Sequence, residues 1–510
     1  MNFQLYTFMR RFLLSTLLTF PFLIFSQSNS FVHLVGTWDY EVLNTPSGDY
    51  FGKITFTKEN QLLNGYITTQ GGRTYFAKIN SLKGDSINLF TNAEGFFSTI
   101  KGVIKEGIWE GEVSNQFSGT EPYPFYAKRK TIVNERKVRR FELKDAKTQE
   151  AISFAHINFQ EGGTVTNGQG EFSVKKQNGE KIKIAAIGYE TQYIEINWQE
   201  AQREKTIFLK PQTILLPEIE INARSLNAKD IVKAAINRIN ENYWQQPHNT
   251  ELFYRLKISG PNGQLSHHSE ALLDFYDSEG YKKRGWRKVT KARFTKLKQG
   301  RIVVGEYADF MEGLGLGRIA VFWAHEPIIT RDKPFALSSL DGFDYQLIGV
   351  TKLGDEEVYK IRFDCKKLRD RYTGLGRLKT FNGTLYINKK DYALIRYQSY
   401  TENDWSYENK QSRKYNGGRV REVRRTNKIE LFAKKEGKYI STFAKSETEA
   451  ETHNLARKEV LKSTFMHEIQ VLNANFQNLQ MFKTDLWDYQ EEITYDPSFW
   501  AKFNIVENEY

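Results

Sequence analysis

Apolar and polar residues alternate in short runs along the first part of the chain, between residues 30 and 131. Runs such as TWDYEVL, YFGKITFT and GIWEGEVS recur about every 8–12 residues, and glycine, asparagine and aspartate separate them. Alternation with a period of two places every second side chain on the same face of an extended strand. Short strands at this regular spacing predict a small antiparallel barrel or sandwich.

The two ends of this segment carry a tryptophan and an arginine. The segment opens on Gly36-Thr37-Trp38 and closes on Arg129. It resembles the calycin (lipocalin-like) barrels, in which an arginine of the last strand covers the tryptophan of a G-x-W motif on the first strand. The resemblance implies structural roles for Gly36, Trp38 and Arg129, with a cation–π contact between guanidinium and indole. A ligand inside the barrel and a solid core both remain open, because small barrels can fill their own interiors.

Residues 136–222 contain further strand-like runs, and two of them flank a glycine-rich stretch. This stretch, EGGTVTNGQGEFSVKK, holds Asn167, Gly168 and Gly170. A phosphate-binding loop needs a helix to follow it, with amide groups directed at the anion. Here strands follow instead, and Asn-Gly supplies the positive φ angles of a tight hairpin turn. We therefore expect this stretch to turn the chain and to bind nothing.

Three motifs of the same segment occur in a defined order. GGTVTNGQGEFSV is followed by IKIAAIGYETQYIEI and then by TIFLKPQTILLPEIEI. Together they resemble the carboxypeptidase regulatory-like domain, which implies a prealbumin-type β-sandwich of seven strands. Gly188 and Tyr189 match the bend of that family and take a structural role by resemblance. The family is an accessory module of secreted enzymes and TonB-dependent receptors, and it implies no chemistry for these residues.

The pattern changes at residue 224, where one helix precedes a long series of strands. Asn227 can cap this helix. At helical spacing, one apolar face is formed by Ile231, Val232, Ala235, Ile236, Ile239 and Tyr243. Hairpin signals follow at Asn388-Lys389-Lys390 and at Glu436-Gly437. Residues 224–510 are predicted to form a large curved antiparallel sheet with the helix packed against its concave side.

The first 26 residues have the composition of a secretory signal peptide. Arg10 and Arg11 precede an apolar stretch from Phe12 to Phe25, and Ser26 offers a small residue for cleavage. The apolar stretch is too short to span a bilayer comfortably, and Pro21 interrupts it. We expect residues 1–26 to be removed on export to the periplasm or the outer membrane, leaving no transmembrane helix in the mature chain. A membrane anchor is the alternative.

Basic residues gather in one stretch of a chain that is basic overall. The formal net charge is +12, and residues 282–301 hold ten Lys or Arg and no acid. A candidate surface for anions is formed by Lys282, Lys283, Arg284, Trp286, Arg287, Lys288, Lys291 and Arg293. If they project to one side, they fit anionic lipid, lipopolysaccharide, a glycan or an envelope protein. The alternative is a solvated hairpin face without a partner, and nucleic acid is disfavoured because an exported protein rarely meets it.

Motifs for catalysis and metal binding are weak in this sequence. His267 and Glu270 have the H-x-x-E spacing of a metallocarboxypeptidase zinc pair, but the surrounding pattern is a hairpin, so we interpret the pair as fortuitous. Gly313, Gly315 and Gly317 lack the strand–turn–helix context of a dinucleotide loop. We predict no catalytic residue, no metal site and no cofactor.

The patterns together favour a mainly β, multidomain protein that acts by binding. The C-terminal phrase NGTLYINKKDYALIRY resembles exported carboxypeptidase-regulatory-like proteins of unknown function. Our first hypothesis is a non-enzymatic binding or scaffold protein of the cell envelope. The second is a carrier of lipid or another apolar ligand, because a sheet with one helix is similar to the half-barrel lipoprotein carriers. The third is a secreted hydrolase with an unrecognised site.

Overall fold

The structure is a computed structural model that describes most of the chain between residues 34 and 482. The described residues are 34–46, 48–59, 62–70, 74–93, 96–116, 121–130, 138–159, 163–175, 181–197, 204–212, 227–260, 263–304, 327–330, 333–373, 377–408, 419–454, 458–482 and 499–500. The predicted signal peptide and the glycine-rich loop at 313–317 lie outside them. Within these ranges, no helix has the length and the apolar composition that crossing a membrane requires.

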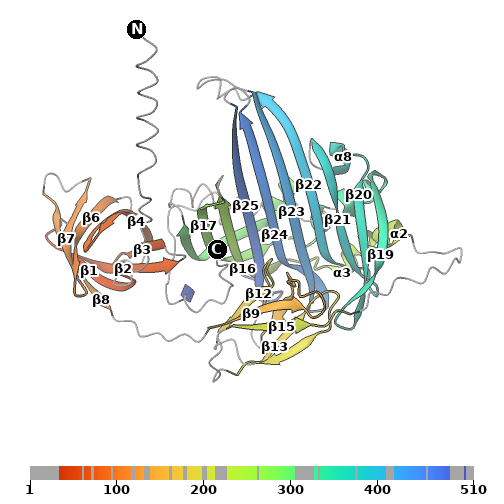
Figure 1. The fold of residues 1–510 in the computed structure, drawn as a ribbon, viewed down its shortest axis with the longest axis horizontal. Helices are drawn as coiled ribbons and strands as arrows, with labels where there is room; N and C mark the ends of the chain where they lie inside the picture. Colours follow the sequence, from red (N-terminus) through yellow and green to blue (C-terminus); the bar gives the residue numbers. More distant parts are fainter. Residues whose placement is uncertain are drawn as a thin grey trace, which may run out of the picture.

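The N-terminal module is a closed antiparallel barrel of eight strands (Figure 1). Its strands are β1 (Gly36–Val42), β2 (Tyr50–Glu59), β3 (Leu62–Thr68), β4 (Thr74–Lys83), β5 (Ser86–Ala93), β6 (Phe96–Lys105), β7 (Ile108–Asn115) and β8 (Tyr123–Lys130). Each strand pairs with the next, and β8 closes the barrel on β1. The predicted small antiparallel barrel is confirmed.

Aromatic side chains fill the barrel interior. Trp38 is fully buried, and its ring centroid lies 6.5 Å from that of Trp109, which in turn lies 4.7 Å from that of Phe125. Arg129 is the register partner of Trp38, and its Nη2 donates to the carbonyl of Val35 (2.6 Å). The structure therefore has a solid core around Trp38, and the cation–π contact with Arg129 stays a prediction.

The second module is a sandwich of seven strands in two sheets. Its strands are β9 (Val138–Asp145), β10 (His156–Asn158), β11 (Gly163–Val165), β12 (Glu171–Lys175), β13 (Lys181–Ala185), β14 (Gln192–Glu195) and β15 (Glu204–Leu209). One sheet has the order β11-β10-β13-β14 and the other has the order β12-β9-β15. Ile157 and Ile184 of the first sheet pack with Phe141 and Phe172 of the second. The predicted sandwich is confirmed.

The glycine-rich stretch of this module turns the chain, but it does not form a hairpin. The strands that flank it, β11 and β12, pair with β10 and β9 in different sheets. Asn167 Oδ1 accepts hydrogen bonds from the amides of Gln169 (3.0 Å) and Glu171 (2.8 Å). The positive φ falls on Gly170 (φ 78°) and not on Asn167 or Gly168. The predicted hairpin was wrong because the Asn167 side chain closes the turn, without pairing of the flanking strands.

The third module is built on one antiparallel sheet of ten strands. These are β16 (His248–Ser259), β17 (Leu265–Asp277), β18 (Arg293–Val304), β19 (Phe343–Leu353), β20 (Glu356–Cys365), β21 (Leu378–Asn388), β22 (Leu394–Glu408), β23 (Arg419–Lys435), β24 (Lys438–Asn454) and β25 (Glu459–Asn475). Their order is β18-β17-β16-β25-β24-β23-β22-β21-β20-β19. Strand β25, the last of these in the sequence, therefore pairs with β16, the first in the sequence. The hairpins predicted at Asn388 and at Glu436-Gly437 join β21 to β22 and β23 to β24.

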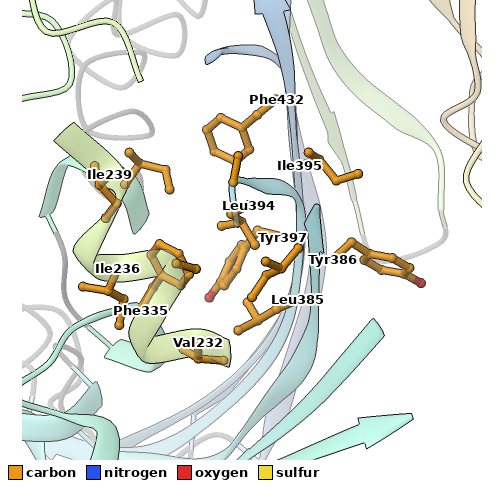
Figure 2. Packing of buried hydrophobic residues seen from close by; sticks show 14 of the residues in the cluster. Val232, Ile236, Ile239, Phe335, Leu385, Tyr386, Leu394, Ile395, Tyr397 and Phe432 are labelled. Atoms are coloured by element: carbon orange, nitrogen blue, oxygen red, sulfur yellow. The ribbon is translucent and has the colours of Figure 1, made fainter. Parts of the chain in front are cut away.

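Short helices cover one face of this sheet. They are α2 (Ala228–Asn237), α3 (Ile239–Asn242), α4 (Trp286–Ala292), α7 (Pro327–Thr330), α8 (Asp370–Thr373), η2 (Lys333–Phe335) and η3 (Leu340–Gly342). Asn227 Oδ1 caps α2 by accepting from the amide of Lys229 (3.0 Å). The whole predicted apolar face is buried, and Figure 2 shows Val232 and Ile236 on the side of the sheet that carries Leu385. The predicted helix on the sheet is confirmed.

Candidate anionic-surface site

The basic stretch at 282–301 runs from the end of β17, through a turn and α4, into β18. Of the residues predicted to form the anionic surface, four lysines are exposed, and we call them the lysine group: Lys282, Lys283, Lys288 and Lys291. The side chains of Trp286 and Arg287 lie outside the described part of the structure. The lysine group is therefore the part of the predicted surface that the structure places in solvent.

Arg284 and Arg293 do not belong to this exposed surface, and the prediction was wrong for both. Each side chain is buried and binds the carboxylate of Asp277. Arg284 donates from Nη1 to Oδ1 and from Nη2 to Oδ2, both at 3.0 Å, and Arg293 donates from Nε to Oδ2 at 2.8 Å. Asp277 precedes the basic stretch, so a count of charges within residues 282–301 missed it.

Asp277, Arg284 and Arg293 form an ion cluster that we call the arginine clamp. The amides of Glu279 and Gly280 also donate to Asp277 Oδ1, both at 2.9 Å. Burial alone would raise the pKa of Asp277, but the charges of Arg293 and Arg284 outweigh it and hold this pKa well below its usual range. Charge-assisted, bidentate hydrogen bonds of this kind fix geometry strongly. The clamp therefore holds the turn after β17 and the start of β18 in one arrangement.

Hydrogen bonds connect the turn between β17 and α4, which contains Arg284, to neighbouring elements. The hydroxyl of Tyr281 accepts from the amide of Ser441 in β24 (2.5 Å). The amide of Tyr281 donates to the carbonyl of Trp244 (2.8 Å), and that of Arg284 donates to the carbonyl of Ile329 in α7 (3.1 Å). The turn is thus connected to the sheet, to the segment after α3 and to α7.

The cavity beside the clamp is too small for an organic ligand. Its volume is about 10 Å³, and it is lined by His248, Thr250, Phe275, Tyr281, Arg293, Ile440, Ser441 and Val471. This volume has room for about one water molecule. The clamp therefore supports the turn after β17 and helix α4, and it does not form a binding pocket.

Helix α4 directs two of the four lysines into solvent by its own periodicity. Val289 and Ala292 are three residues apart and buried, whereas Lys288 and Lys291 are three residues apart and exposed. Residues at this spacing are neighbours on one helix face. Ammonium groups attract anions as mobile point charges, without the fixed geometry of a guanidinium fork. The lysine group therefore suits an extended anionic surface better than one small ligand.

The zinc-like pair is not brought together by the fold. His267 and Glu270 both lie on β17, where side chains three residues apart point to opposite faces of the sheet. His267 Nε2 is hydrogen-bonded to Ser269 Oγ (2.9 Å), whereas Glu270 Oε1 is hydrogen-bonded to His268 Nε2 (3.2 Å). Among the residues that the structure describes, no three His, Cys, Asp or Glu side chains gather in a way that could hold a metal ion.

Glu270 instead belongs to a buried row of alternating charges that the sequence reasoning missed. Arg255 Nε donates to Glu270 Oε1 and Arg301 Nε donates to Glu270 Oε2, both at 2.7 Å. Glu468 continues the row, with its Oε1 at 3.4 Å from Arg255 Nη1. Burial alone would raise the pKa of Glu270, but Arg301 and Arg255 keep it well below its usual range. The available signal was the presence of ionisable residues within apolar strands such as LFYRLKIS.

Comparison with known families gives one match, and it falls on the sandwich. Residues 142–221 match the model of the CarboxypepD_reg-like domain. The resemblance inferred from the three ordered motifs is thereby confirmed for this part of the chain. No curated protein matches the sequence.

Among the solved structures that match, two share a remote likeness with large parts of this chain. A DUF1329 family protein from Desulfovibrio piger ATCC 29098 is 12% identical with a TM-score of 0.21, and the match covers 52% of this chain and 98% of that chain. A protein of unknown function from the DUF3598 family of Nostoc punctiforme PCC 73102 is 7% identical with a TM-score of 0.15, over 87% of this chain and 98% of that chain. Likenesses at this level carry no argument about function.

The CarboxypepD_reg-like domain contacts the ten-stranded sheet through its bend. Gly188 has a φ of +88°, and its amide donates to the carbonyl of Lys352 in β19 (2.8 Å). The hydroxyl of Tyr189 donates to Asp145 Oδ2 (3.0 Å). Burial raises the pKa of Tyr189 to about 12, and the hydrogen bond with Asp145 acts in the same direction. The bend thus closes the domain and joins it to β19.

Proposed function

We propose that this protein is a non-enzymatic scaffold protein of the cell envelope that binds anionic lipid surfaces through the lysine group. The observation that carries the proposal is the arginine clamp. It removes Arg284 and Arg293 from the surface and fixes the turn and α4, so that four ammonium groups stay in solvent. The signal-like N-terminus supports export, and the net charge of the chain, which is +10 without Arg10 and Arg11, supports contact with the phosphate groups of envelope lipids.

A carrier of apolar ligands takes second place in this proposal. Such a carrier needs an open apolar pocket between the helix and the sheet. In the described part of this layer, buried side chains of α2 and α3 belong to one apolar cluster with Phe335, with Leu385 of β21 and with Leu394 of β22. A bound apolar molecule in native mass spectrometry of protein taken from its own envelope would reverse this order.

Binding to vesicles tests the proposal. The full chain is mixed with vesicles of phosphatidylglycerol and phosphatidylcholine, and the bound fraction is measured by cosedimentation. In the test variant, the four members of the lysine group are replaced by Gln. We expect at least a tenfold loss of affinity, with the free energy of unfolding changed by less than about 0.5 kcal/mol because the side chains are exposed.

A second quadruple variant separates the lysine group from the effect of net charge. Four exposed lysines of the barrel, all distant in sequence from the clamp, are replaced by Gln: Lys53, Lys101, Lys105 and Lys128. Both variants lose the same formal charge, and the barrel variant should keep most of its binding. Equal losses in the two variants would mean that binding follows net charge alone. If the variant without the lysine group binds vesicles as the parent does, the lysine group does not take part in binding.

A further inference from the structure

The CarboxypepD_reg-like domain lies on the face of the ten-stranded sheet opposite the helices. Phe154 and Val165 of this domain pack on an apolar strip formed by Ile429, Leu431 and Phe443. The ring centroids of Phe154 and Phe443 are 5.6 Å apart. Leu431 contacts the domain whereas Phe432, the next residue of β23, packs in the helix layer. Consecutive residues of a strand point to opposite faces, so the two layers cover opposite faces of the sheet.

The hydrogen bonds that the described residues make across this interface join neutral groups. Gln470 Nε2 donates to the carbonyl of Gly163 (3.1 Å), and Gln470 Oε1 lies 3.5 Å from Thr164 Oγ1. The bend adds the hydrogen bond between Gly188 and Lys352 already described. Bonds of this kind contribute little to docking compared with well-paired charges. The apolar strip and these few hydrogen bonds therefore hold the domain, and the interface is sensitive to any charge added within it.

Cations of three adjacent strands approach this interface from the sheet. His156 is the register partner of Val165, so both side chains lie on the domain face that meets the sheet. The positive charges of Arg396 in β22 and Lys435 in β23 act on His156. Lys445 in β24 lies over the ring of Phe154, with Nζ 5.9 Å from the centroid. A proton on His156 would add a further positive charge to this cationic surrounding.

We infer that the CarboxypepD_reg-like domain is a detachable cap that protonation of His156 releases from the ten-stranded sheet. Release exposes the apolar strip and Lys445, which the closed cap covers.

The sign and size of the pH effect follow from linkage. Burial, together with the positive charges of Arg396 and Lys435, lowers the pKa of His156 from the ordinary value of 6.5 to about 4 in the closed form. The open form therefore binds the proton more tightly than the closed form. Between pH 7 and pH 5 the closed-to-open equilibrium should fall about twenty-fold, and above pH 7 it should be constant.

Spin-label distances in the full chain test this inference. Labels are attached at Gln169→Cys in the domain and Glu449→Cys on the sheet, both exposed positions, in a Cys365→Ser background. The substitution Phe154→Ala is added because it weakens packing of the domain on the sheet, so that the open form becomes measurable at pH 7. If the Phe154→Ala protein does not fold, Val165→Ala is used in its place. In this background we expect a shorter, narrow component that dominates at pH 7.5 and a longer, broad component that grows towards pH 5.

The variant His156→Gln distinguishes release of the cap by protonation of His156 from a nonspecific effect of low pH on the protein. In that variant the distance distribution should stay the same from pH 7.5 to pH 5, whereas His453→Gln, a half-buried histidine on the same sheet, should behave as the parent does. Far-UV circular dichroism at each pH checks that the domain stays folded when it detaches. A pH response that persists in His156→Gln, or a closed distance at pH 5 in the weakened background, overturns the inference.

Discussion

Asp277 is the residue on which the basic segment depends, because two buried guanidinium groups share its carboxylate. Replacing Asp277 by Asn leaves Arg284 and Arg293 buried without their common anion. Removing one partner of a buried ion cluster destabilises a protein by about 3–5 kcal/mol. We expect a loss of this size in the free energy of unfolding, measured with urea at pH 7.

An exposed ion pair gives the matched control for this measurement. Asp341 pairs with Lys229 at the surface, with Oδ1 and Nζ 2.5 Å apart. Exposed pairs contribute little, so Asp341→Asn should leave the unfolding midpoint unchanged. If Asp277→Asn is as stable as Asp341→Asn, the clamp does not hold the segment in the way described.

His268 makes stability depend on pH at the residue scale. Burial lowers its pKa to about 4, although its contact with Glu270 acts in the opposite direction. Between pH 6.5 and pH 4 the unfolded chain binds a proton that the folded chain does not, so stability falls as pH falls through this window. The contribution of His268 reaches about 3 kcal/mol at the acid end. His268→Gln should remove this part of the slope in urea unfolding measured at several pH values, and an unchanged slope would contradict the assignment.

The N-terminus of α2 provides a test at the scale of one element. Asn227 Oδ1 accepts from the amide of Lys229, which is one of the amides that the helix itself leaves unpaired. Asn227→Ala should lower the free energy of unfolding by about 1 kcal/mol, and Asn227→Asp should preserve it. Thermal unfolding of both variants checks this expectation. Equal losses in the two variants would show that the cap does not stabilise α2.

Elements whose signal is local could be predicted from the sequence. Alternation with a period of two marked the strands of the barrel and of the large sheet, and helical spacing marked the buried face of α2. The turns at Asn388 and Glu436-Gly437 also appear where their residues indicate. In each case the pattern repeats within a few residues, so neighbouring side chains carry the information.

Features that depend on strand register could not be predicted in this way. The alternating row of Arg301, Glu270, Arg255 and Glu468 comes from four strands, and only their pairing places these charges side by side. Arg284 and Arg293 looked exposed because their acid, Asp277, lies outside the basic stretch. Asn167-Gly168 looked like a hairpin because the sequence does not say which strand each flank will pair with.

At the scale of the whole molecule, the large sheet is the body on which the other modules pack. The barrel contributes Tyr66, which is buried in a cluster with Leu252 and Phe253 of β16. The CarboxypepD_reg-like domain covers the strip at Leu431, and the helices cover the other face. The lysine group therefore projects from a layered body and not from an isolated loop.

Export is a separate prediction about the whole chain. If residues 1–26 are a signal peptide, the chain should appear in the periplasmic or outer-membrane fraction of the cell that makes it, shortened at its N-terminus. Deleting these residues should leave the protein in the cytoplasm, because the export machinery then has no apolar segment to bind. N-terminal sequencing of the fractionated protein checks both statements. A full-length N-terminus in the membrane fraction would favour the alternative, a membrane anchor.

The salt dependence of vesicle binding shows whether the lysine group binds an anionic surface by its charge. Binding of the full chain to phosphatidylglycerol vesicles is measured as ionic strength rises from about 0.05 to 0.5 M, over which screening of exposed charges increases strongly. We expect at least a tenfold fall in affinity for the parent protein and a much smaller fall for the variant without the lysine group. The variant without the four barrel lysines should show a fall like that of the parent. Parent binding that does not respond to salt, or a lysine-group variant with the full salt response of the parent, would contradict the claim that these four lysines bind an anionic surface.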